Sequence, residues 1–164
     1  HAMWKHVLVA NHWMKKFIKN KSFTQNELII HPASADCAVV EIDHEKNFIP
    51  LLLLRDITVP GHSIRILQDG TAVFLNTSKG EIIHFHPQLK KIISTAVIGS
   101  GFLRGARQLS DGGLLLGDNQ RLMLFDIVQQ KILAQYTISD NSNESVYDIN
   151  ILPDHFDLPP LSFL

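Results

Sequence analysis

The sequence predicts an all-β fold made of repeated four-stranded antiparallel units, and three observations support this prediction. A related phrase recurs about every 40 residues, first over residues 61–93 and again over residues 103–133. Each copy contains an Asp-Gly pair between two apolar runs, which is a strong hairpin signal. Each copy also has a strand of the form apolar-x-Phe-x, followed by a Lys-Ile start to another strand. Four short strands in a period of about 40 residues are typical of a β-propeller blade.

The N-terminal segment, residues 4–23, departs from the repeat, whereas residues 24–164 are predicted to form one propeller-like domain. Residues 4–18 fit either a strand or a short amphipathic helix, and their periodicity does not distinguish the two. The first three residues, His1-Ala2-Met3, are typical of what remains of a cleaved affinity tag, so we leave them out of the predicted fold.

Apolar runs of strand length occupy four positions in each repeated unit. First strands are expected at residues 63–67, 105–109 and 148–152, and second strands at residues 28–31, 71–76 and 113–118. Third strands are expected at residues 37–43, 81–86 and 121–126, and fourth strands at residues 48–54, 92–97 and 132–137. The sequence therefore holds about three and a half units, because it opens a fourth unit with a single strand.

Two Asp-Gly pairs, Asp69-Gly70 and Asp111-Gly112, join the first strand to the second in two of the units. We expect a two-residue type I′ turn at both places, because that turn needs positive φ at both central positions.

The number of units does not complete a ring, since closed propellers usually have four to eight blades. Three explanations are open. The chain is a piece of a longer propeller, two copies complete each other as a homodimer, or the units form something other than a ring.

Composition excludes several classes of function. The net charge of −1 gives no electrostatic reason to expect nucleic acid as a partner. No run of 18 apolar residues is present, so we expect no membrane span. Cys37 is the only cysteine, which rules out an intrachain disulfide, and we expect a cytoplasmic protein.

Polar residues recur at two equivalent positions of the units, where loops form the usual binding mouth of a propeller. His62, Arg104 and Tyr147 stand at the entry to each first strand, and Asp148 is adjacent to them. The exits of the second strands carry His31, Asn76 and Asp118. One interpretation is a polar ligand site centred on His62, Arg104 and Asp148, and the other is that these groups satisfy backbone atoms in turns.

Signals for cofactor or metal chemistry are weak. His84 and His86 alternate on a predicted strand and therefore face the same side, but no third ligand is evident, so we predict no metal site. There is neither a phosphate-binding Gly-x-x-x-x-Gly-Lys loop nor a Gly-x-Ser-x-Gly elbow, and we expect no cofactor.

The order and spacing of several motifs resemble those of an uncharacterised bacterial propeller-like family with P-H-S, G-F-x-R-G and Y-D-V-x-V-L-P elements. The corresponding stretches here are residues 59–64 (VPGHSI), 69–70 (DG), 75–77 (LNT), 80–83 (GEII), 101–105 (GFLRG) and 144–153 (ESVYDINILP). The resemblance covers about residues 57–154. It implies a propeller, a full length of about twice this chain and no activity that can be named.

His62, Arg104 and Asp148 fall on motif positions of that family. The chain departs from the family after Leu116, where residues 117–120 make a short turn in place of a longer G-L-S-x-P-R element. More loosely, the chain is similar to arylsulfotransferase-like and NHL-type propellers, and in the first of these His62 would be the natural nucleophile.

Three functions are therefore carried forward. The first is a non-catalytic binding module for a protein or a small polar ligand. The second is a propeller-type hydrolase, lyase or transferase that uses His62 as its catalytic residue and Arg104 as an anion clamp. The third is a structural role, in which a half-propeller exists to assemble with itself. The fold alone does not decide among them.

Overall fold

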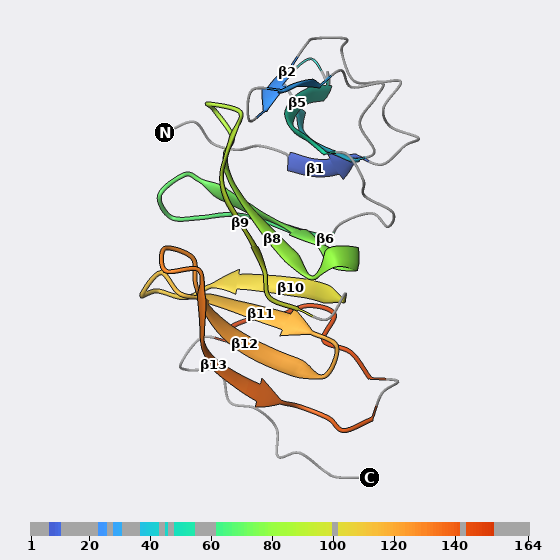
Figure 1. The fold of residues 1–164 in the computed structure, drawn as a ribbon, viewed down its shortest axis with the longest axis vertical. Coiled ribbons are helices and arrows are strands. Elements are labelled where there is room, and N and C mark those ends of the chain that lie inside the picture. The colour runs from blue at the N-terminus through green and yellow to red at the C-terminus, as the bar shows by residue number, and fades with distance from the viewer. Residues whose placement is uncertain are drawn as a thin grey trace.

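A computed structural model confirms the all-β prediction and describes residues 7–10, 23–25, 28–30, 37–42, 45, 48–54, 62–99, 102–141 and 144–152. The described residues form four antiparallel sheets, and the three larger ones follow one another along the long axis of the molecule (Figure 1). One short 3-10 turn, η3 (Thr77–Lys79), joins two strands of the central sheet. No helix among the described residues has the length and apolar character that crossing a bilayer requires.

Two of the sheets are complete four-stranded units with strands in sequence order. The central sheet consists of β6 (His62–Ile66), β7 (Ala72–Asn76), β8 (Glu81–His86) and β9 (Lys91–Val97). The next sheet consists of β10 (Leu103–Gln108), β11 (Leu114–Asp118), β12 (Arg121–Asp126) and β13 (Lys131–Thr137). These are the two copies of the repeated phrase, and both form as predicted.

The first sheet differs from the prediction. It has the order β1-β4-β5, with β1 (Val7–Ala10), β4 (Cys37–Ile42) and β5 (Phe48–Leu54). The stretch predicted as its second strand, β3 (Leu28–Ile30), pairs instead with β2 (Phe23–Gln25) in a separate hairpin. That part of the prediction is wrong, because β1 supplies the strand next to β4 and the hairpin is inserted between them.

The two complete sheets share the same irregularities, which supports the alignment of the two repeated units in the sequence. The register shifts between His62 and Ile64 in β6 and between Arg104 and Ala106 in β10. The skipped residues, Ser63 and Gly105, have φ values of 54° and 60°. An extra residue in the left-handed region is the signature of a β-bulge, so His62 and Arg104 occupy equivalent backbone positions.

The hairpin turns at the Asp-Gly pairs are not of the expected type I′. Only Gly70 and Gly112 have positive φ, whereas the preceding aspartates do not. The amide of Gly70 donates to the carbonyl of Leu67 at 3.0 Å, and the amide of Leu67 donates to the carbonyl of Thr71 at 2.8 Å. This is the three-residue loop in which a type I turn is followed by a left-handed glycine.

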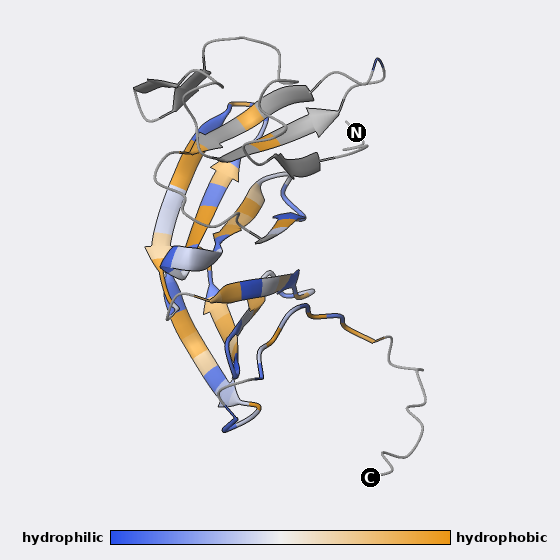
Figure 2. Cartoon of the chain, turned by 90° about the vertical axis from the view of Figure 1, so that its right-hand side faces the viewer, coloured by the Kyte–Doolittle hydropathy of each residue, from blue (hydrophilic) through white to orange (hydrophobic). Residues whose placement is uncertain are grey.

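The apolar core lies between consecutive sheets rather than within one sheet. Figure 2 shows hydrophobic residues along the strands of the two complete sheets. One cluster joins the central sheet to the β10–β13 sheet and includes Val73, Leu75, Leu116 and Phe125. The other joins the opposite face of the central sheet to the first sheet and includes Val39, Phe74 and Phe85. Each cluster fills the interface, or seam, between two neighbouring sheets and buries the facing side of both, as in stacked repeat units.

A strand is predicted at residues 148–152, where it would begin a fourth unit. The structure has no regular strand over residues 144–152, but these residues lie against β10 and β11. A Cβ atom placed on Gly105 would be 3.2 Å from the Cα of Asp148, and one placed on Gly117 would meet Cγ1 of Val146. The segment therefore occupies the place that the first strand of a next sheet would take.

Candidate functional site

Arg104 is held against two aromatic rings at the entry to β10. Its guanidinium carbon lies 4.2 Å from the ring centroid of Phe102 and 4.3 Å from that of Tyr147. The two rings meet edge to face, with centroids 6.2 Å apart. Cation–π contacts of this kind cover the faces of a guanidinium and leave its N–H donors in the plane. The Nε atom of Arg104 is buried, and it has no hydrogen-bond partner in the part of the chain that the structure describes.

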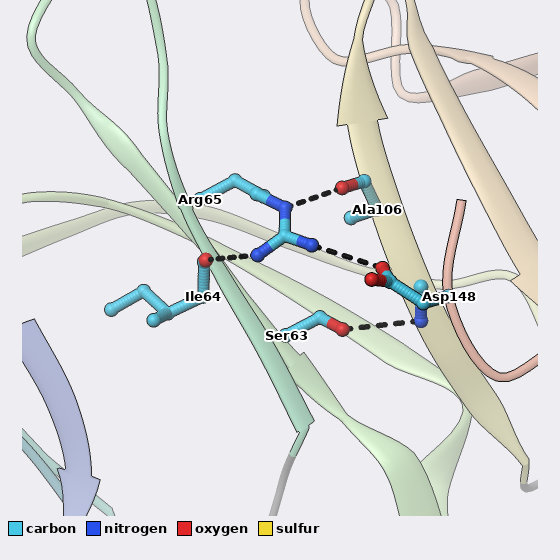
Figure 3. A network of polar contacts seen from close by, with 6 residues as sticks. Ser63, Ile64, Arg65, Ala106 and Asp148 are labelled. Carbon is cyan, nitrogen blue, oxygen red and sulfur yellow. Dashed lines mark hydrogen bonds and ion pairs between the residues drawn. The ribbon is translucent and has the colours of Figure 1, made fainter. Parts of the chain in front are cut away.

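A second arginine, Arg65, joins three segments that follow one another around the array (Figure 3). Arg65 belongs to β6. Its Nε donates to the carbonyl of Ala106 in β10 at 2.7 Å, and its Nη2 donates to Oδ1 of Asp148 at 3.0 Å. Its Nη1 also donates to the carbonyl of Ile64 at 3.2 Å. Beside this network, the amide of Gly105 donates to Oγ of Ser63 at 3.1 Å. Asp148, a predicted site residue, is thus an ion-pair partner of Arg65.

Asn76 and Asp118 end the second strands of their sheets, and both side chains are buried. Nδ2 of Asn76 donates to Oε2 of Glu81 at 2.9 Å, and Nη2 of Arg121 donates to Oδ2 of Asp118. In each case the partner is the first residue of the third strand, across a tight turn. These contacts favour the interpretation that Asn76 and Asp118 hold the turns in place.

His62 begins β6 and pairs with Leu75 of β7 in the backbone register. Its side chain lies outside the described atoms, and His31 lies outside the described residues. The neighbouring backbone places the entries of β6 and β10 side by side, because Ser63 contacts Gly105 directly.

A groove of about 460 Å³ lies beside Tyr147. The turn after β11 and the segment before the incomplete fourth unit form its walls, and the amide of Val146 donates to the carbonyl of Asn119 at 2.6 Å between them. The groove is lined by Asn119, Gln120, Ile138, Ser139, Glu144, Ser145, Val146, Tyr147 and Asp148. Of the predicted site residues, Tyr147 and Asp148 line this groove, and Arg104 lies against the ring of Tyr147.

A second groove, of about 340 Å³, lies at the opposite ends of the strands. Its carboxylates serve turns, since Asp111 accepts from the amide of Gly113 at 3.0 Å and Asp126 accepts from the amides of Val128 and Gln129. None of the predicted site residues lines it. The groove beside Tyr147 is accordingly the better candidate.

Positive charge dominates the first strands of the two complete sheets. The charged residues within β6 and β10, His62 aside, are Arg65, Arg104 and Arg107, and Arg107 is exposed. Asp148 neutralises one of these three charges through its contact with Arg65. The groove beside Tyr147 is itself lined by Glu144 and Asp148, so the positive charge that favours an anionic ligand is that of Arg104 and Arg107 in β10.

The His84–His86 pair serves structural contacts. Nε2 of His84 lies 2.8 Å from Oγ1 of Thr71, which in turn donates to Asp69 at 2.7 Å. Burial lowers the pKa of His84 below 6.5, and the nearby charge of Asp69 opposes that effect only in part. The ring of His86 accepts a hydrogen bond from the amide of Leu89. Within the described residues, no group of three His, Cys, Asp or Glu side chains is placed to hold a metal ion.

Two residues that contact the predicted site residues are not predicted from the sequence. Phe102 precedes β10 within the residue 101–105 motif, and nothing in that motif indicates that its ring contacts Arg104. Arg65 was missed because strict alternation along β6 is broken at Ser63. An arginine within a predicted first strand was the signal that could have identified Arg65.

Comparison with solved structures confirms the propeller-like fold. The WD40 β-propeller domain of Doa1 is 16% identical, has a TM-score of 0.54, and matches 76% of this chain and 40% of its own length. Virginiamycin B lyase from Staphylococcus aureus, in a catalytically inactive form with quinupristin, is 11% identical, has a TM-score of 0.57, and matches 80% of this chain and 44% of its own. A protein of unknown function from Bacteroides caccae is 14% identical and has a TM-score of 0.50. It matches 63% of this chain and 40% of its own length.

No protein-family model and no curated protein sequence matches the chain. At these identities the likeness concerns the fold alone. The chain spans less than half the length of each of these three structures. It therefore corresponds to part of a propeller ring.

Proposed function

We propose that the chain is a β-propeller binding module without chemistry of its own. Its ligand carries an anionic group, either on a small polar molecule or on a protein side chain, and that group binds at Arg104. The observation that carries the proposal is the position of Arg104, which two aromatic rings hold in one orientation beside the groove at Tyr147. A planar guanidinium fixed in this way is suited to paired hydrogen bonds with a carboxylate or a phosphate.

Binding is favoured over catalysis because the predicted polar site residues are already engaged in contacts within the fold. An enzyme needs a general base or a nucleophile beside the ligand. Asn76 and Asp118 are engaged in turns, and Asp148 is paired with Arg65. His62 is the candidate left for the enzyme alternative, in which Arg104 would act as an anion clamp. Because the described contacts of Asn76, Asp118 and Asp148 are structural, the binding module is the stronger proposal.

A second copy of the chain belongs to this proposal as the partner that completes the ring. Ala96 and Ile98 of the central sheet are partly buried, because they pack against the apolar cluster between this sheet and the β10–β13 sheet. Their counterparts on the outer face of the β10–β13 sheet are Tyr136 and Ile138, which remain 71% and 50% exposed. An exposed seam of this kind is typical of a surface that another sheet covers.

Thermal unfolding in the presence of simple anions tests the ligand. Succinate and inorganic phosphate are the anionic probes, and succinamide is the neutral probe of similar size. We expect the anions, at concentrations well above their Kd, to raise the unfolding midpoint, because a ligand that binds only the folded state stabilises it. Arg104→Gln should remove the increase, whereas Lys131→Gln, an exposed charge on β13, should retain it.

Three results would overturn this ligand assignment. One is the absence of stabilisation by either anion. Another is equal stabilisation by succinamide, which would show that charge is not recognised. The third is an unchanged effect in Arg104→Gln, which would place the anion elsewhere on the surface.

A further inference from the structure

In the part of the chain that the structure describes, the first sheet has three strands, whereas the next two sheets have four each. Its bulge lies between Val39 and Val40 of β4, and the equivalent bulge in the central sheet lies between His84 and Phe85 of β8. β4 is therefore a third strand, and β1, which pairs with it, is a second strand like β7. β1 also lies against β6, as β7 lies against β10. In the described part of the chain, no strand pairs with the other edge of β1.

The opposite end of the array has the complementary defect. Residues 144–152 lie against β10 as a first strand would, and Ile149 is buried there. Ile151 and Leu152 remain 47% and 45% exposed, and no described strand pairs with this segment. Unpaired edges of this kind are templates for pairing with another chain.

The two defects match in number. With the β2–β3 hairpin set aside, the described residues form three strands in the first sheet, four in each of the next two sheets and one further segment, which together make three complete sets of four. Figure 1 shows that the central sheet and the β10–β13 sheet lie between β1 and the far end of the array. The segment and β1 therefore cannot meet within one molecule, but they can meet between two.

We propose that residues 148–152 of one copy pair with β1 of a second copy, and that the exchange is reciprocal. First strands run antiparallel to second strands in both complete sheets, so the added strand would do the same. Two copies then form six blades, which lies within the usual range of four to eight. The proposal rests on the proposed function, in which a second copy completes the ring. It adds the strand pairing that joins the two copies, namely residues 148–152 with β1, and we call this pairing the joint.

The same arrangement covers the exposed seam. In the dimer, the partner's β1, β4 and β5 extend the blade that residues 148–152 begin. That blade packs on the outer face of the β10–β13 sheet, where Tyr136 and Ile138 are exposed. The chain matches 40% of the Doa1 propeller and 44% of virginiamycin B lyase, so two copies approach one ring in length.

The register in which residues 148–152 would pair with β1 follows from the equivalent positions in the complete sheets. Arg65 of β6 faces Val73 of β7, and Val73 faces His84 of β8. Val9 holds the place of Val73, because it faces Val39, the equivalent of His84. Asn150 holds the place of Arg65 in the incomplete unit. Val9 of one copy should therefore face Asn150 of the other, with Cα atoms about 4.5–5.5 Å apart, which is within disulfide range.

Light scattering on a sizing column gives the first test. The chain mass is 18.5 kDa, so we expect a dimer of about 37 kDa. Tyr136→Glu should weaken the dimer at least tenfold, by analogy with charges placed in buried interfaces. Val97→Glu is the matched control, since Val97 is also 71% exposed but lies on the outer strand of the central sheet, and it should leave the dimer intact.

Disulfide trapping then tests the strand pairing in a Cys37→Ser background. Val9→Cys combined with Asn150→Cys should give a covalent dimer on oxidation, whereas Val9→Cys combined with Ser145→Cys should not. A monodisperse monomer at about 100 μM would overturn the proposal. A dimer that forms no Val9–Asn150 disulfide, or that Tyr136→Glu leaves unchanged, would overturn it too. Anion binding is measured separately on the same samples, so a failure of this joint is distinguishable from a failure of the ligand site.

Discussion

Arg65 and Asp148 are 83 positions apart in sequence, and their side chains form an ion pair at 3.0 Å. Because Arg65 also bonds the carbonyl of Ala106, it connects the central sheet both to β10 and to the segment that follows the last strand. The segment is thereby fixed in the position of a first strand.

The two partners of this ion pair should differ in their effect on stability. Asp148 is 55% exposed, so Asp148→Asn should lower the free energy of unfolding by less than about 1 kcal/mol, with a smaller effect at high salt. Arg65→Met should cost more, about 1–2 kcal/mol, because the buried residue Ala106 also loses a hydrogen bond to its carbonyl. Urea unfolding of both variants measures the difference, and equal losses would contradict it.

Two glycines with positive φ should respond differently to alanine. Gly112 has φ of 91° and open space around it, so Gly112→Ala should cost only the conformational strain, about 1–2 kcal/mol. Gly80 has φ of 61°, and an added Cβ would lie 2.5 Å from the carbonyl oxygen of Gly99. Gly80→Ala should therefore destabilise the chain at least twice as much in thermal unfolding. Similar midpoints for the two variants would argue against the close approach of Gly80 and Gly99.

Stability should fall as the pH is lowered from about 7.5 to 5.5. Burial lowers the folded-state pKa of His84 below 6.5, so the unfolded state binds more protons in this range. The contribution of His84 is fully present above pH 6.5 and is lost as the pH falls from there through the lower pKa of the folded state. His84→Gln should reduce the pH dependence of the unfolding midpoint, and His86→Gln, two residues away on the same strand, is the control. An unchanged slope in His84→Gln would contradict the prediction.

Asp69 should extend this acid sensitivity to lower pH. Its own burial would raise its pKa, but the hydrogen bonds from Thr71 and the charge of His84 hold the pKa below 3.8. Its contribution is present above pH 3.8 and is lost below it. Thr71→Val should therefore reduce the loss of stability in that acidic range, as measured by circular dichroism during acid titration.

The turn contacts at Asn76 and Asp118 should affect stability and leave ligand binding unchanged. Asp118→Ala should cost about 2 kcal/mol, because it removes a buried carboxylate from Arg121, which can still reach water. Asn76→Ala should cost about 1 kcal/mol. Anion titrations on both variants check the second part, and lost binding with intact folding would return these residues to the site.

The sequence predicted the two complete sheets because their turns and strands repeat the same local chemistry. Asp-Gly pairs, a buried phenylalanine in the third strand and a Lys-Ile start to the fourth recur in both. The first sheet carries fewer of these markers. Its short strand at Leu28–Ile30 resembles a second strand, and only long-range pairing shows that β1 takes that place.

The site was predictable only in part, for a reason that lies in the backbone. The overlay placed Arg104 and Tyr147 at equivalent entries, and their side chains are in contact. Arg65 was not foreseen, since the bulge at Ser63 changes the alternation of the strand. A serine with positive φ gives no signal in the sequence comparable to that of Gly105, which marks the same bulge in the next unit.

The central sheet contributes residues to both apolar clusters, and this limits where the polypeptide can be cut. A break in the connection between β9 and β10 would divide one cluster between two fragments, each with an uncovered apolar face. A break at the exposed turn near Val128, which is 88% exposed, would leave both seams assembled. Circular permutants and split versions of this protein should therefore be opened inside a sheet, at its outer turn, and insertions during evolution would be tolerated at the same points.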